Sequence, residues 1–101
     1  MSTFIPVDRL HETPTLIAFH HPRPTHTTHI LLVPKRVIPT MAALNAEHCD
    51  FLADVFSATK HIIADLNLAD AGYSLVCNGG KSQDVAQLHF HLISDTPIDN
   101  N

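Results

Sequence analysis

Polar and apolar positions alternate along residues 87–93, where Gln87, His89 and His91 are separated by leucine and phenylalanine. Successive side chains of a β-strand point to opposite faces, so the three polar side chains share one face. The pattern predicts a strand whose apolar face is buried and whose open face carries a row of imidazoles. Two histidines in register beside a glutamine favour a functional site over an ordinary solvated face.

Short apolar runs predict the other strands. Residues 8–12 and 16–21 are expected to form a hairpin around Thr13-Pro14-Thr15, and further strands are expected at 28–34 and 72–78. The segment 21–26 reads as a loop because two prolines lie within three residues.

Residues 45–68 carry a helical pattern instead. Asn45 is a good N-cap, and Glu47 follows in the first turn, where the helix dipole favours negative charge. Apolar positions recur at helical spacing, which predicts one buried stripe. Its expected members are Leu52, Val55, Phe56, Thr59, Ile62, Ile63 and Leu66.

These elements predict an α+β fold, an antiparallel sheet of about five strands with one long helix packed on one face. The chain has 101 residues, so we expect one domain over residues 1–101. A small core and an unpaired sheet edge also favour a homodimer.

Charge and composition exclude several classes of protein. The net charge is −4 with only six lysines and arginines, which argues against a nucleic-acid-binding surface. No apolar run is long enough to span a membrane, and no secretory signal is visible. The two cysteines form no CxxC motif, which suits a cytoplasmic protein.

Histidine is the unusual component, with nine residues. A His-x-His strand fits metal ligation, which needs further ligands, and His20, His21, His26 and His29 lie far back in the chain. It also fits phosphoryl or nucleotidyl transfer, in which one imidazole attacks phosphorus and neighbours donate hydrogen bonds. The loop at 78–83 offers such donors in its backbone amides and in Asn78 and Gln83.

The sequence resembles the histidine triad (HIT) superfamily of nucleotide hydrolases and transferases. The family signature is His-φ-His-φ-His-φ-φ, with φ apolar, and residues 87–93 read Gln-Leu-His-Phe-His-Leu-Ile. "LIAFHHPRPTHTTHILLVPKR", "ADLNLADAGYSLVCNGG" and "SQDVAQLHFH" are similar to further family segments in the same order, from about residue 8 to 94.

The resemblance implies a role for each matching residue. His89 would attack the α-phosphate of a nucleoside phosphoramidate or dinucleoside polyphosphate and form a nucleotidyl-histidine intermediate. His91 would donate to the phosphoryl oxygens, and His29 would support the triad from a neighbouring strand. Asn78 and Gln83 would lie near the phosphate and leaving group. The scheme requires no cofactor and no metal, and the family commonly forms homodimers.

Four positions depart from the family pattern, and one of them is Val37, which replaces a histidine. Gln87 replaces the first triad histidine and cannot share a proton. His21 stands where the family has Asp or Asn for the ribose hydroxyls. Asp84 stands where many members have Ser or Thr, and its carboxylate would repel phosphate unless it turns away. A nucleotide-binding protein with little turnover, and a metal site on the His-x-His strand, are therefore alternatives to an enzyme.

Overall fold

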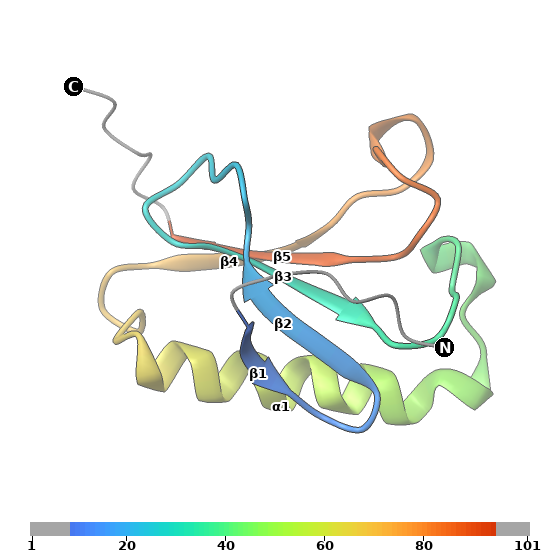
Figure 1. The fold of residues 1–101 in the computed structure, drawn as a ribbon, viewed down its shortest axis with the longest axis horizontal. Helices are drawn as coiled ribbons and strands as arrows, with labels where there is room; N and C mark the ends of the chain where they lie inside the picture. The colour runs from blue at the N-terminus through green and yellow to red at the C-terminus, as the bar shows by residue number, and fades with distance from the viewer. Residues whose placement is uncertain (1–8, 95–101) are drawn as a thin grey trace.

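The computed structural model describes residues 9–94, which form a five-stranded sheet with one long helix beneath it (Figure 1). The strands are β1 (Arg9–Glu12), β2 (Leu16–His20), β3 (His29–Pro34), β4 (Tyr73–Cys77) and β5 (Phe90–Ser94). The helix is α1 (Cys49–Asp65), and three short 3₁₀ helices are η1 (Met41–Ala43), η2 (Ala46–His48) and η3 (Gly80–Ser82). The sheet order is β1-β2-β3-β5-β4, with every neighbouring pair antiparallel. The predicted α+β architecture is confirmed.

The β1–β2 turn is fastened to the helix. The hydroxyls of Thr13 and Thr15 both donate to Asp54 Oδ2 on α1, at 2.9 and 2.6 Å. Hydrogen bonds to a charged acceptor are about twice as strong as neutral ones. Strands β1 and β2 pair antiparallel on either side of this turn, so the predicted hairpin is present. The bonds to Asp54 hold its turn against the helix layer.

Asn45 begins the helical segment, as predicted. Its side chain accepts from the Glu47 backbone N–H at 2.8 Å, and its own N–H donates to His48 Nδ1 at 3.0 Å. These two bonds make a capping box over η2, which leads directly into α1.

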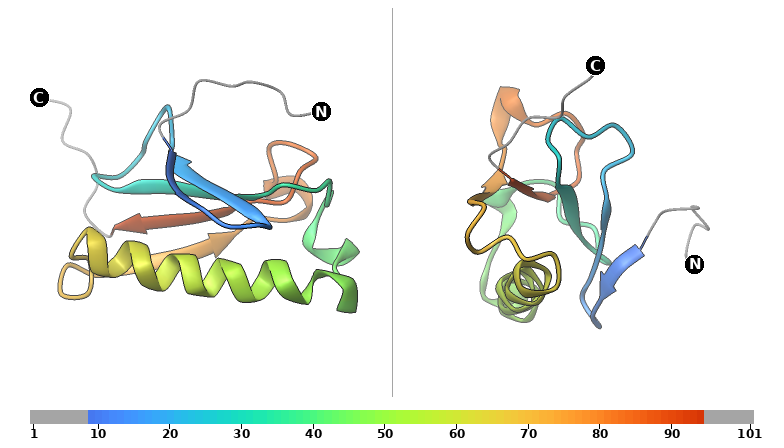
Figure 2. Two further views of the ribbon diagram at one scale, coloured as in Figure 1. Left: turned by 60° about the horizontal axis from the view of Figure 1, so that its bottom comes forward. Right: turned by 90° about the vertical axis from the view of Figure 1, so that its left-hand side faces the viewer.

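Helix α1 lies along one face of the sheet, which is clear when the helix is seen nearly end-on (Figure 2). Its buried face differs from the predicted stripe, because Phe56 is 65% exposed. The buried residues of α1 are Phe51, Val55, Ala58, Thr59 and Ile62. The repeat Phe51, Val55, Ala58, Ile62 has the spacing i, i+4, i+7, i+11, so the apolar stripe is rotated away from Phe56.

The sheet contributes the facing half of the core. Its buried apolar side chains are Leu16, Ala18, Ile30, Leu32, Phe90 and Leu92, and Leu88, just before β5, joins them in the core. Strand β3 pairs with β5 so that Leu31 lies opposite His91. Consequently the alternate side chains of β3 and β5, which point away from α1, meet on the other face.

Strand β5 is shorter than expected, since its ladder begins at Phe90 rather than at Gln87. Before it, the Leu88 N–H donates to the carbonyl of Ile38 at 2.7 Å, outside any ladder. The alternation nevertheless continues through this extension: Leu88 is buried, whereas Gln87 and His89 are half-buried. The predicted polar row is therefore present, although its first part lies on a loop.

Within residues 9–94, the structure contains no helix that is both long and apolar enough to cross a membrane.

Candidate active site

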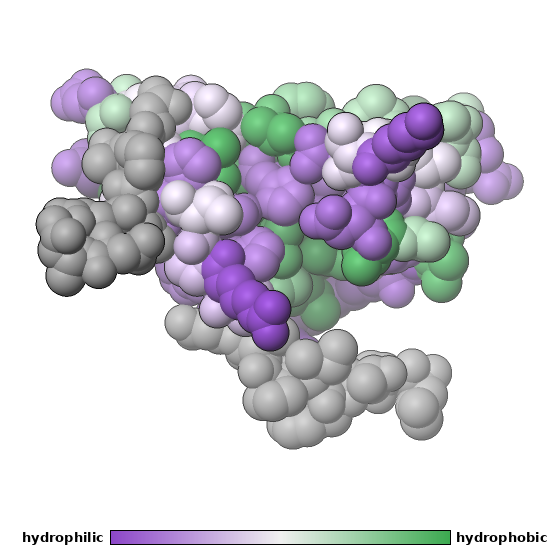
Figure 3. All heavy atoms as spheres, turned by 90° about the horizontal axis from the view of Figure 1, so that it is seen from above, coloured by the Kyte–Doolittle hydropathy of each residue, from purple (hydrophilic) through white to green (hydrophobic). Residues whose placement is uncertain are grey.

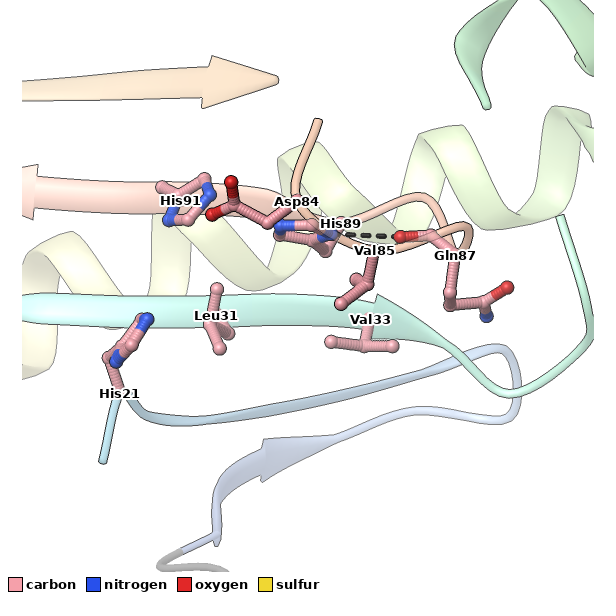
Figure 4. A pocket seen from close by; sticks show the side chains of 8 residues that line it. All are labelled: His21, Leu31, Val33, Asp84, Val85, Gln87, His89 and His91. Atoms are coloured by element: carbon pink, nitrogen blue, oxygen red, sulfur yellow. Dashed lines mark hydrogen bonds between the residues drawn. The ribbon is translucent and has the colours of Figure 1, made fainter. Parts of the chain in front are cut away.

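His89 lies directly before β5, and a local hydrogen bond orients its ring. Its Nδ1 is 2.8 Å from the main-chain carbonyl oxygen of Gln87 (Figure 4). A carbonyl oxygen can only accept, so Nδ1 carries the hydrogen. In the neutral ring the lone pair is then on Nε2, the nitrogen that could attack an electrophile.

His91 belongs to a chain of hydrogen bonds that reaches back to residue 25. The Thr25 backbone N–H donates to His29 Nδ1 at 3.2 Å, and His29 Nε2 lies 2.9 Å from His91 Nδ1. Because Nδ1 of neutral His29 accepts, its Nε2 carries the hydrogen and donates to His91. Neutral His91 must then carry its own hydrogen on Nε2, which makes that nitrogen a donor toward a ligand.

His21 completes the cluster from the end of β2. The Arg23 backbone N–H donates to its Nδ1 at 2.9 Å, so the neutral ring again has its hydrogen on Nε2. The His21 ring centroid lies 4.4 Å from that of His29 and 6.3 Å from that of His91. Three imidazoles from three different segments of the chain are thus brought together near His89.

Burial and mutual repulsion keep these rings neutral. Burial, followed by the neighbouring rings of His21, His91 and His26, lowers the pKa of His29 to about 4. Burial and then the neighbouring His89 ring lower the pKa of both His91 and His21 below the usual range. A neutral ring with one fixed hydrogen has a defined donor and a defined acceptor, as the hydrogen-bond chain requires.

Three of these rings, those of His21, His89 and His91, line a hollow of about 250 Å³ on the face of the sheet turned away from α1. We call it the histidine hollow. Its lining residues are His21, Leu31, Val33, Asp84, Val85, Gln87, His89 and His91 (Figure 4). On this face, apolar and hydrophilic side chains lie next to one another (Figure 3). A few polar groups around an apolar floor are typical of small-molecule sites.

Gln87 lines the same hollow, but its amide is engaged elsewhere. Its Oε1 accepts from the Ile38 N–H at 3.1 Å, and its Nε2 donates to the carbonyls of Arg36 at 3.0 Å and Pro34 at 3.4 Å. Only its main-chain carbonyl reaches His89. The side chain of Gln87 therefore joins the start of β5 to the segment after β3.

Asn78 and Gln83 lie beside the histidine hollow rather than in it. Asn78 lines a second hollow together with His29 and His91, so the His91 ring borders both hollows. Gln83 lines a third hollow, which shares Asp84 and Val85 with the first. Both hydrogens of its amide are used, since Nε2 donates to the carbonyls of Pro39 at 2.7 Å and Val85 at 2.8 Å.

Three residues that shape the site, Leu31, Val33 and Thr25, were not predicted from the sequence. Leu31 and Val33 form the apolar floor, which the alternation of β3 could have indicated. Thr25 orients His29 through its backbone N–H, and no sequence signal marks that contact. Asp84 does not turn away from the site, because it lines the histidine hollow.

The alternative of a metal site finds no support in the described part of the chain. Residues 9–94 contain no group of three or more His, Cys, Asp or Glu side chains placed to hold a metal ion.

Comparison with known proteins shows the family of this chain. The HIT domain family model matches residues 2–98. Purine nucleoside phosphoramidase of Escherichia coli K12 is 31% identical over 96 residues, which cover 93% of this chain and 81% of that protein. A HIT family hydrolase from Legionella pneumophila superposes with a TM-score of 0.84 and 31% identity, covering 90% of this chain and 83% of that one. For a histidine triad nucleotide-binding protein from Candida albicans the TM-score is 0.79 and the identity 27%, with coverage of 96% and 74%. The chain therefore belongs to the HIT family.

Proposed function

We propose that this protein hydrolyses nucleotides by transferring a nucleotidyl group first to His89 and then to water. The observation that carries the proposal is the bond from His89 Nδ1–H to the Gln87 carbonyl, which leaves the Nε2 lone pair for the substrate. The E. coli relative, named as a purine nucleoside phosphoramidase, supports a nucleoside phosphoramidate as substrate. A dinucleoside polyphosphate offers the same α-phosphorus.

Two displacements at phosphorus make up the reaction. In the first, His89 Nε2 bonds to the α-phosphorus, and the bond from phosphorus to the leaving group breaks with its electron pair. The leaving nitrogen or oxygen takes up a proton. In the second, water bonds to phosphorus, releases the nucleoside monophosphate and loses a proton, and the His89 nitrogen regains its lone pair.

The surrounding rings have distinct roles in this scheme. His91 donates from Nε2 to a phosphoryl oxygen, where negative charge grows during attack, and His29 holds it in that tautomer. His21 donates a hydrogen bond from Nε2 to the nucleoside part of the substrate. Asn78 contacts the phosphate from beyond His91, and Gln83 positions the loop that carries Asp84 and Val85. The main-chain carbonyl of Gln87 orients His89, and the side chain of Gln87 holds the segment after β3 in place.

We also propose that the protein is a cytoplasmic homodimer. Phe56 is 65% exposed on α1, and β4 lies at the end of the described strand order. An exposed aromatic side chain and an open strand edge are features that self-association covers. Cys49 and Cys77 are both free thiols, as a reducing compartment favours.

Substitution of His89 tests the proposed function. His89→Ala is expected to lower kcat/KM for adenosine phosphoramidate by about a thousandfold or more, since no other group can form the intermediate. His61→Ala, on the exposed face of α1, is the matched control and should retain activity. Mass spectrometry of rapidly denatured wild-type protein should find one nucleotidyl group attached at His89.

The same measurements separate the alternatives. Unchanged hydrolysis by His89→Ala would show that another residue is the nucleophile. Tight binding of a nucleoside monophosphate, without turnover or adduct in the wild type, would identify a nucleotide-binding protein instead of an enzyme.

A further inference from the structure

Asp84 introduces a negative charge into the histidine hollow. Its side chain is exposed, and its carboxylate points toward the His91 ring (Figure 4). The interaction is electrostatic as well as spatial, because Asp84 opposes the burial that lowers the pKa of His91. No lysine or arginine of the described chain lines this hollow, and Asp84 belongs to neither ion pair found among the described residues.

Asp84 lies on the side of the histidine hollow that is opposite the apolar floor (Figure 4). The apolar floor of the hollow is formed by Leu31 and Val33, on β3. Asp84 and Val85 lie on the loop before β5. In Figure 4 the Asp84 carboxylate lies beside the His91 ring, on the side of the hollow away from Leu31, whereas Val85 lies near Val33. A nucleoside that packs on the floor therefore directs the leaving group toward Asp84.

Space for a leaving group is present there. Asp84 and Val85 also line the adjoining third hollow, together with Pro39, Thr40 and Gly80. Val85 is 57% exposed, so it offers apolar surface to an alkyl chain. No lysine or arginine of the described residues lines this third hollow either.

We propose that Asp84 selects the leaving group by charge, so that the preferred substrates are nucleoside phosphoramidates whose amine carries a further positive charge. This inference rests on the proposed function and makes it more specific. A polyphosphate leaving group would bring several negative charges beside this carboxylate. An alkyl amine that ends in an ammonium would place its chain on Val85 and its charge near Asp84.

Coulomb's law gives the expected size of the selection. Two unit charges about 4 Å apart in bulk water interact by about 1 kcal/mol, which is about fivefold in a rate or equilibrium constant. Because Asp84 is exposed, the solvent-screened limit applies rather than that of a buried pair. Added salt should weaken the preference, since exposed charges are screened.

Three matched substrates test the selection. Each joins AMP through a P–N bond to an amine with the same butyl spacer, which ends in an ammonium, a methyl or a carboxylate group. For the wild type, kcat/KM is expected to fall by about fivefold at each step from ammonium to methyl to carboxylate. Asp84→Asn, which keeps the size and removes the charge, should bring the three values within about twofold of one another.

Asp70→Asn is the matched control, since this exposed carboxylate in the α1–β4 connection lies outside the lining of both hollows. Its three kcat/KM values should keep the wild-type ratios. Equal values for the three substrates in the wild type, or unchanged ratios in Asp84→Asn, would overturn the charge selection and leave the proposed function standing. If the wild type hydrolysed none of the three, the proposed function would fail and the selection with it.

Discussion

His29 shows how one buried side chain controls the chemistry of its neighbour. It is only 7% exposed, and its two nitrogens are occupied by the Thr25 N–H and by His91. Protonation of His29 would remove the acceptor that Thr25 uses. The same event would bring a cation against His21 and His91. The hydrogen-bond chain therefore works only while His29 is neutral, and burial holds it neutral at pH 7.

The low pKa of His29 predicts a loss of stability in acid. The ring is protonated with a pKa of about 4 in the folded protein, against the usual 6.5, so the unfolded chain binds more protons between these values. The His29 contribution is complete above about pH 6.5 and disappears as the pH falls toward 4. The free energy of unfolding should therefore fall by on the order of 2–3 kcal/mol over this range from His29 alone.

Urea unfolding of the wild type and His29→Asn at pH 7.5 and pH 4.5 measures this contribution. Other titrating groups are common to both proteins, so the difference between their pH dependences reports His29. Parallel curves would show that His29 titrates normally in the folded state.

The elements meet at the site through side-chain bonds as well as through the sheet ladder. Strand β3 ends at Pro34, and the segment that follows returns to the start of β5, where Gln87 bonds to three backbone groups at 34–38. Leu88 adds a backbone bond to Ile38. We call these four hydrogen bonds the Gln87 clamp. The clamp fixes the loop from which the Gln87 carbonyl orients His89. A glutamine at position 87 therefore has a structural role that does not involve proton transfer.

Removal of the Gln87 side chain should lower the stability of the fold more than it lowers the rate of hydrolysis. Gln87→Ala leaves the Ile38 N–H without its acceptor, and the free energy of unfolding should fall by about 1–3 kcal/mol. The main-chain carbonyl that orients His89 remains, so kcat should fall less than about tenfold, far less than for His89→Ala.

Gln87→Glu is the informative companion, because its carboxylate can still accept from Ile38 but cannot donate to the Pro34 and Arg36 carbonyls. It should be destabilised as well. A Gln87→Ala protein that stays folded yet is as inactive as His89→Ala would instead make the Gln87 side chain part of the catalytic machinery.

At the scale of the whole molecule, the two faces of the sheet have separate tasks. One face packs on α1 and holds most of the core, whereas the other carries the histidine hollow (Figures 1 and 3). The exposed side of α1, with Phe56, lies in the helix layer on the opposite face of the sheet from the hollow. Self-association through the helix can therefore leave the hollow open to substrate.

The proposed dimer predicts a particular response to substitution of Phe56. Light scattering should give a mass of about 22 kDa for the wild type, twice the 11.1 kDa of one chain. Phe56→Asp should shift the mass toward one chain, because it places a charge in an apolar contact, while Phe56→Leu should keep the dimer. A wild-type mass of one chain at micromolar concentration would contradict the proposal.

The sequence alone was sufficient for the features that depend on local periodicity. Alternation along 87–93 predicted which side chains share a face, and the cap at Asn45 together with the helical spacing predicted α1. Two predictions from local periodicity were wrong: the buried stripe of α1 and the start of β5. The stripe was assigned to Phe56 because several overlapping apolar sets satisfy helical spacing, and only packing against the sheet selects the set with Phe51 and Ala58. The start of β5 was misplaced because alternation does not reveal whether a ladder partner is present.

Tertiary structure decided how the polar side chains are used. His29 and His91 lie 62 residues apart in the sequence, and the β3–β5 register brings their rings within a hydrogen bond. The same register, with the connections around it, sets the tautomer of His91, engages the amide of Gln87 on residues 34–38 and brings Asp84 beside the site. A hydrogen bond depends on distances of a few tenths of an ångström between segments that periodicity treats as independent. For that physical reason, local periodicity could identify the row of imidazoles, but only the folded chain could assign each ring its donor and its acceptor.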